Sequence, residues 1–226
     1  MNTNNSDETA ALLFNLGVKE EKLFVANDRP EAQERPDEFK MFTVENFNQE
    51  TTLTATFYFS RLKSESLSYE LRKYDAQLSW KDKSLSSRKQ TLFLVQSVII
   101  TLREAFNLLQ GRSVYKELSA STGDKYQAWV RLNLGKKDFH DNYEIEYNRS
   151  FQAYDLGRAL ANYPIQELQA KESALRLIQS LLKGNKERVN FTSGKKVEKV
   201  YIEANPQMET ITISPVIRPL KKREKR

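Results

Sequence analysis

Hydrophobic and polar residues alternate along two neighbouring segments of the chain. In residues 52–59, leucine, alanine and phenylalanine alternate with threonine and tyrosine, and residues 73–80 repeat this pattern. A period of two residues is typical of a strand with one buried face, so we predict two antiparallel strands here. Residues 91–96 are mostly apolar without alternation, which predicts either a strand covered on both faces or a buried helical turn.

Three later segments carry helical signals. Thr101 and Glu104 have the spacing of a capping box at the start of a segment with one apolar face, which Gly111 ends. Asp155 can cap a second, short helix. A third helix is predicted over residues 171–183. Its expected apolar stripe consists of Ala174, Leu175, Ile178, Leu181 and Leu182.

Alternation predicts further strands at residues 126–134, 143–147 and 210–213, and a hairpin at residues 189–204 that turns at Gly194. Strands that mostly follow one another, with helices between groups of them, indicate an α+β fold. We predict a mostly antiparallel sheet with about three packed helices.

The first and third predicted helices end alike. Leu-Leu-x-Gly closes both at an offset of 73 residues. Each helix is then followed by a predicted strand that bears a valine, a glycine turn and an amphipathic strand, with Val114 and Gly123 in the first unit and Val189 and Gly194 in the second. This order predicts an internal duplication of a helix–strand–strand unit, at about residues 101–134 and 174–205. Coincidence is the alternative, because this is an ordinary way for a helix to end.

Composition along the chain suggests three parts. Residues 1–38 are acidic and contain prolines, which predicts a flexible segment and linker with a short helix at residues 10–16. Residues 39–217 form the predicted single domain. Residues 218–226 form a basic tail of six basic residues, one acidic residue, one proline and one leucine.

Composition also excludes several classes of function. The 226-residue chain has no cysteine and one histidine. Disulfides, a thiol nucleophile, iron–sulfur clusters, Cys-ligated zinc and a His-rich metal cage are therefore ruled out. The sequence has no glycine-rich phosphate loop and no serine-hydrolase elbow. Without a signal pattern or an apolar run of membrane-spanning length, we expect a cytoplasmic protein that does not contact membranes.

The net charge of +6 is unevenly distributed, since residues 1–50 contain eleven acidic and five basic residues while the tail is basic. A cationic cluster attracts phosphate backbones, which predicts DNA or RNA as a partner. A solvated tail that aids solubility is the alternative.

The candidate binding residues lie on two predicted strands and in the tail. Trp129 and Arg131 share the polar face of one strand, and Lys199 and Tyr201 share that of another. Rings beside cations on a sheet can stack on bases and contact phosphates, but they can equally pack under a helix or form a protein interface. The tail completes this candidate site with Lys221, Lys222, Arg223, Lys225 and Arg226.

A catalytic alternative centres on the single histidine. Asp138, His140 and Asp141 place the imidazole between two carboxylates, which suits either a metal-assisted hydrolase or a solvent-exposed turn. Glu144 and Glu146 project from the same face of one predicted strand. They could act as a pair of catalytic carboxylates, or they could simply form the solvated face of an amphipathic strand. No further partners are identifiable in the sequence, so we predict no catalytic residues, no metal site and no cofactor.

Several motifs resemble those of one protein family. They include Gly111-Arg112-x-Val114-x-Lys116, Tyr154-Asp155-Leu156 and Glu203-Ala204-Asn205-Pro206-Gln207. In these motifs and their order, the chain resembles an uncharacterised Bacteroidetes family found with conjugative transposons and related mobile elements. The resemblance implies a mobile-element setting and brings no known activity.

We therefore predict a non-enzymatic accessory protein of a mobile element that binds nucleic acid or a protein of the transfer machinery. The alternative is a protein–protein interaction module, such as an adaptor or inhibitor, without nucleic-acid contact.

Overall fold

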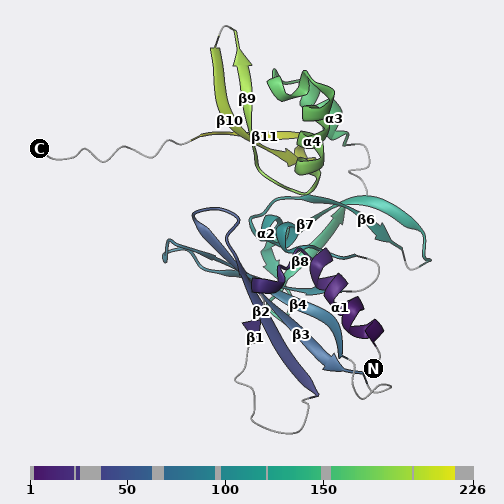
Figure 1. Ribbon diagram of the computed structural model, residues 1–226. Helices are drawn as coiled ribbons and strands as arrows, with labels where there is room; N and C mark the ends of the chain where they lie inside the picture. The colour runs from purple at the N-terminus through teal and green to yellow at the C-terminus, as the bar shows by residue number, and fades with distance from the viewer. Residues whose placement is uncertain are drawn as a thin grey trace, which may run out of the picture.

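The computed structural model describes residues 3–22, 24–25, 37–62, 69–94, 98–120, 122–148, 154–194 and 196–216. Figure 1 shows an α+β fold, as predicted. The described strands pair antiparallel in three separate sheets, whereas we expected a single sheet. The basic tail and most of the predicted linker lie outside the described residues. No helix in these residues is long and apolar enough to cross a membrane.

The N-terminal half builds a five-stranded antiparallel sheet in the order β1-β2-β3-β4-β5. Its strands are β1 (Phe24–Val25), β2 (Glu38–Glu45), β3 (Thr51–Arg61), β4 (Tyr69–Trp80) and β5 (Arg88–Phe93). The predicted strand pair is confirmed, because β3 and β4 pair antiparallel with Leu53 opposite Leu78. Both leucines are buried, and the residues that alternate with them along β3 are only half-buried.

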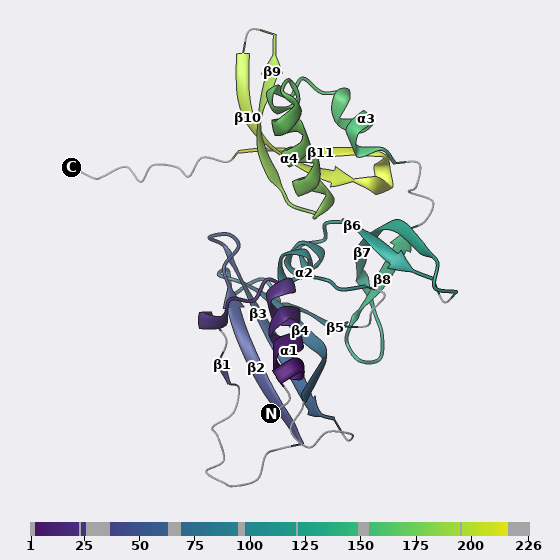
Figure 2. The same ribbon diagram turned by 45° about the vertical axis from the view of Figure 1, so that its right-hand side comes forward.

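Helices α1 (Thr3–Asn15) and α2 (Leu102–Leu109) pack on this sheet beside β4. Figures 1 and 2 show them lying along the sheet. Leu102 of α2 and Phe57 of β3 are buried in one hydrophobic cluster with Leu16. The sheet therefore has one face under the helices and one face turned away from them.

The N-terminus differs from the prediction. We expected polar, flexible residues before residue 10 and a domain that begins near residue 39, but α1 begins at Thr3 and Leu16 is buried. The backbone of Leu16 also accepts a hydrogen bond from the Leu102 N–H at 2.9 Å. Packing of the apolar side of α1 outweighs the low helix propensity of its polar first turns, which is a tertiary effect.

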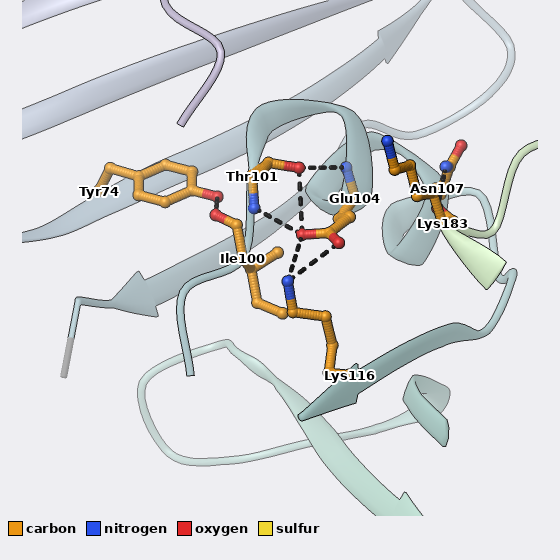
Figure 3. A network of polar contacts seen from close by, with 7 residues as sticks. All are labelled: Tyr74, Ile100, Thr101, Glu104, Asn107, Lys116 and Lys183. Atoms are coloured by element: carbon orange, nitrogen blue, oxygen red, sulfur yellow. Dashed lines mark hydrogen bonds and ion pairs between the residues drawn. The ribbon is translucent and has the colours of Figure 1, made fainter. Parts of the chain in front are cut away.

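Polar contacts fix the start of α2 (Figure 3). The predicted capping box is confirmed: the Glu104 N–H donates to Thr101 Oγ1 at 3.3 Å, and the Thr101 N–H donates to the Glu104 carboxylate at 2.9 Å. Lys116 Nζ pairs with this buried carboxylate at 3.0 Å. The Tyr74 hydroxyl donates to the Ile100 carbonyl at 2.7 Å, just before the helix. These contacts tie α2 to β4 and to the strand that follows the helix.

The second sheet consists of β6 (Val114–Ser119), β7 (Lys125–Lys137) and β8 (Tyr143–Asn148), with β7 in the centre. Consecutive side chains of β7 enter different hydrophobic clusters. Val130 joins the cluster of the five-stranded sheet, and Trp129 joins a second cluster. This sheet is therefore covered by apolar residues on both faces.

The second cluster belongs to the C-terminal elements, which gather at one end of the molecule in Figures 1 and 2. These elements are α3 (Leu156–Ala161), α4 (Lys171–Leu182), β9 (Glu187–Ser193), β10 (Lys196–Asn205) and β11 (Thr210–Pro215), and the sheet order is β11-β10-β9. The Asp155 side chain caps α3 by accepting from the Arg158 N–H, as predicted. Gly194 turns the predicted hairpin with a φ of 60°. Short 3₁₀ helices lie at Glu20–Lys22, Gln166–Leu168 and Pro206–Met208.

Two predicted burial patterns are wrong. Leu175 was expected in the apolar stripe of α4 but is 49% exposed, and Leu177 is buried in its place. The stretch around residue 93 was expected to be covered on both faces if it formed a strand, but β5 is an edge strand of its sheet and its Phe93 is 59% exposed. In both cases the direction from which the neighbouring layer packs decides burial, and a short apolar run does not reveal that direction.

Candidate nucleic-acid interface

One face of the five-stranded sheet carries cations and aromatic rings in alternation. Lys40 of β2 is paired with Tyr58 of β3, and Tyr58 is paired in turn with Lys73 of β4. Lys73 is paired with Phe93 of β5. We call these four residues the aromatic–basic row. Adjacent strands are about 4.8 Å apart. The two rings lie two strands apart, and so do the two lysines, so the strands of each pair are separated by about 10 Å.

The row lies on the face turned away from α1 and α2. Phe57 precedes Tyr58, and Tyr74 follows Lys73; both are fully buried in the cluster beneath the helices. Because consecutive side chains of a strand point to opposite faces, Tyr58 and Lys73 point away from that cluster. Phe93 alternates in the same way with the buried Leu92. The row is therefore accessible from one side.

Hydrogen bonds hold the Tyr58 ring in place. Its hydroxyl donates to Asp75 Oδ2 at 2.7 Å, and the Thr91 hydroxyl donates to the other carboxylate oxygen at 2.7 Å. Lys89 Nζ forms a salt bridge with Asp75 Oδ2 at 2.7 Å. The carboxylate thus links β3, β4 and β5 directly beside the row.

The protonation states follow from these contacts. Burial and the hydrogen bond to Asp75 raise the pKa of Tyr58 to about 12, so its phenol remains a donor near neutral pH. Burial also acts to raise the pKa of Asp75, but hydrogen bonds from Lys89, Tyr58 and Thr91 outweigh it and lower that pKa. Asp75 is therefore ionised, and Lys89 balances its charge.

The two lysines of the row keep their charge available. Lys40 Nζ lies 5.0 Å and Lys73 Nζ 5.1 Å from the centre of the Tyr58 ring. Neither forms a salt bridge with a carboxylate in the described part of the chain. An exposed cation–π contact is worth about 0.5–1 kcal/mol, so either ammonium group can move to a phosphate at small cost.

The structure corrects the prediction for Trp129. Its side chain is 2% exposed and packs between Tyr115 and Tyr154, at ring-centre distances of 5.2 and 5.6 Å. The C-terminal elements cover this face of β7, so the indole cannot stack on a base. Its neighbour Arg131 is only partly exposed, and its Nε donates to the Glu146 carboxylate. The packing alternative holds for Trp129, and the charge of Arg131 is already paired.

The other predicted binding residues are distributed differently. Lys199 is exposed on β10, and Tyr201 is half-buried with Lys186 Nζ 5.4 Å from its ring centre. They lie on a different sheet from Trp129 and Arg131. The tail residues Lys221, Lys222, Arg223, Lys225 and Arg226 lie outside the described residues.

The histidine segment forms a turn. Asp138 Oδ1 accepts from the backbone N–H groups of His140 and Asn142, both at 2.9 Å. Asp141 pairs with Lys137 at 2.7 Å. Glu144 and Glu146 are both paired with cations of β7. Within the described ranges, no three acidic, histidine or cysteine side chains are grouped so that they could hold a metal ion.

Sequence reasoning missed the aromatic–basic row, although part of its signal was visible. Tyr58 and Lys73 occupy the polar positions of the two alternating segments. Their pairing, and the approach of Lys40 and Phe93 on either side, depend on strand register, which alternation leaves open.

The chain matches no protein-family model, no curated protein and no solved structure. The Bacteroidetes resemblance therefore stays a prediction, and function is inferred from the residues of this chain.

Proposed function

We propose that the protein is a non-enzymatic accessory protein that binds single-stranded nucleic acid across the open face of its five-stranded sheet. The observation that carries this proposal is the aromatic–basic row, in which two lysines alternate with two rings over four paired strands. The sequence resemblance adds a mobile genetic element as the setting.

A single strand suits this surface better than a duplex. Duplex bases are stacked on one another, whereas a single strand can lay a base on an exposed ring such as Phe93. Its phosphates would then lie near Lys40 and Lys73. Every base can stack on a ring, and contacts to phosphates carry no sequence information. We therefore expect the protein to bind single strands with weak sequence preference.

The other predicted cations fit the proposal as auxiliary contacts. Lys199 is exposed on β10, and residues 218–226 carry six basic residues. Each cation that reaches a phosphate would add affinity and steepen the dependence on salt. None of them would supply stacking.

Fluorescence anisotropy tests the proposal over a range of about 50 to 200 mM salt. The labelled probes are a single strand of DNA, a single strand of RNA and a duplex of the same sequence. The double variant Lys40→Gln, Lys73→Gln should make the slope of log K against log salt shallower by about 1.4, since each phosphate contact to a single strand contributes about 0.7. Lys171→Gln, at the exposed start of α4, is the matched control and should leave the slope unchanged.

Duplex binding as tight as single-strand binding, or a double variant that behaves as wild type, would reject the proposal. Absence of any nucleic-acid binding would favour the protein–protein alternative, including a partner from a transfer machinery.

We also propose that the two helix–sheet units share an origin by duplication. In each unit a helix is followed by a three-stranded antiparallel sheet whose second strand is central. Gly111 and Gly184, which follow the two Leu-Leu-x endings, have φ angles of 87° and 75°. Superposing α2 on α4, with Gly111 on Gly184, should bring β6–β8 onto β9–β11. Strands that diverge would contradict a duplication.

A further inference from the structure

A polar pocket of about 390 Å³ lies where the end of α2 meets the start of β9. One wall comes from α2 and the residues just after it, with Arg103, Asn107 and Arg112. The other wall comes from the C-terminal elements, with Asn185, Lys186, Tyr201 and the carboxylate of Glu187. The pocket is separate from the aromatic–basic row, which lies on the face of the sheet turned away from α2.

Two arginines in this pocket have unused donors. Arg112 Nη2 donates to Asn107 Oδ1 at 2.6 Å, but its Nε is buried without a hydrogen-bond partner. The Arg103 guanidinium lies 4.3 Å from the ring centre of Phe47, and the Arg112 guanidinium lies 5.4 Å from that of Phe106. Stacking on a ring fixes the plane of a guanidinium and leaves its edge free for an acceptor.

The charges in and around the pocket are incompletely balanced. Burial lowers the pKa of Arg112 to about 10; the carboxylate of Glu203 opposes this effect, and the cation of Arg103 adds to it. Arg103 is exposed at the rim of the pocket, and the partial burial of its guanidinium lowers its pKa, while the carboxylate of Glu187 acts to raise it. In the described part of the chain, no carboxylate comes within salt-bridge distance of either guanidinium. A buried cation without a partner is costly, and a bound anion would remove that cost.

Hydrogen bonds within the chain hold the two walls of the pocket together. Asn107 Nδ2 donates to the Lys183 carbonyl at 2.6 Å and to Asn185 Oδ1 at 2.9 Å. Figure 3 shows Asn107 beside Lys183, where the two parts of the chain meet. A Cβ at Gly184 would come within 2.7 Å of the Ser113 carbonyl, so the two backbones approach closely here. These contacts fix the position of the two walls relative to each other.

We propose that this pocket binds a phosphate group, held by Arg103 and Arg112 with Lys186 at its edge. Guanidinium groups offer paired N–H donors that match the oxygens of a phosphate. Two guanidinium groups and one ammonium group also match the double negative charge of a phosphate better than the single charge of a carboxylate ligand. The phosphate can come from a small phosphorylated molecule or from the phosphorylated end of a nucleic-acid strand. The site does not depend on nucleic-acid binding at the aromatic–basic row.

Calorimetric titration with inorganic phosphate, at constant ionic strength, tests the site in the full-length protein. The informative variant is Arg103→Gln, because this exposed side chain stacks on Phe47 and forms no hydrogen bond or salt bridge with any residue that the structure describes, so the variant should fold. Arg176→Gln is the matched control: Arg176 occupies the corresponding place in α4 and is also exposed. We expect the affinity for phosphate to fall at least tenfold in Arg103→Gln and to stay unchanged in Arg176→Gln.

Absence of phosphate binding to the wild-type protein, or equal binding by wild type and Arg103→Gln, would overturn the proposal. If phosphate binds, comparing an oligonucleotide that carries a 5′-phosphate with the same oligonucleotide carrying a 5′-hydroxyl distinguishes a strand end from a small phosphorylated molecule as the source of the phosphate. Tighter binding of the phosphorylated strand, lost in Arg103→Gln, assigns the site to a strand end, and equal binding assigns it to a small phosphorylated molecule. Phe93→Ala should leave phosphate binding intact, so this site and the proposed function can fail separately.

Discussion

The Phe93→Ala substitution removes the exposed ring at the edge of the aromatic–basic row. Phe93 is 59% exposed at the end of an edge strand, so the fold gains little from its side chain. We expect the free energy of unfolding to change by no more than about 0.5 kcal/mol, as for most surface substitutions.

The effect on binding should be much larger. Stacking of one base on one ring is worth about 1–3 kcal/mol. At about 1.4 kcal/mol per factor of ten, its loss weakens binding of a single strand by about 5- to 150-fold. The salt dependence should not change, because Phe93 carries no charge.

The assay is fluorescence anisotropy with a labelled single strand at low salt, with urea unfolding of the same preparations. Phe139→Ala is the matched control, since Phe139 is 91% exposed in the turn between β7 and β8. Phe93→Ala binding within about twofold of wild type would refute the reasoning. So would an equal loss in Phe139→Ala.

Three further predictions concern the fold and its charges. Lys116→Met leaves the buried carboxylate of Glu104 without its cation, and urea unfolding should show a loss of about 3 kcal/mol. Leu177→Ala should destabilise the protein by about 2–5 kcal/mol in the same assay, whereas Leu175→Ala should change its stability by less than about 0.5 kcal/mol, because only Leu177 is buried. The pKa of Asp75 is lowered in the folded protein, so its carboxylate stabilises the fold above the ordinary pKa of about 4, and this contribution is lost as the pH falls below it. The stability difference between wild type and Asp75→Asn should therefore be greatest near neutral pH and shrink below about pH 4. A difference that grows as the pH falls would contradict a lowered pKa for Asp75.

Local signals predicted the elements that depend on neighbours in the sequence. The spacing of Thr101 and Glu104 gave the start of α2, and Gly194 gave the turn of the β9–β10 hairpin. The alternation in β3 and β4 fixed which side chains face the core. Each of these signals acts over a few residues, and a single sequence contains them in full.

The binding surfaces depend on partners that are distant in the sequence. Trp129 looked like an exposed ring because nothing in its own strand shows that Tyr154 and the C-terminal elements cover it. Lys40 and Phe93 come together with the polar positions of β3 and β4 only through register. The sequence therefore suggested a ring beside cations on a sheet, and the structure places that combination on a different sheet.

Photo-crosslinking tests the location of the bound strand most directly. Single strands that carry 5-bromodeoxyuridine or 4-thiouridine would be irradiated with the full-length protein, and the modified peptides would be mapped by mass spectrometry. We expect crosslinks on β3 and β5, at Tyr58 and Phe93, which a competing unlabelled strand removes. Specific crosslinks confined to other elements, or none from a strand shown to bind, would contradict the account.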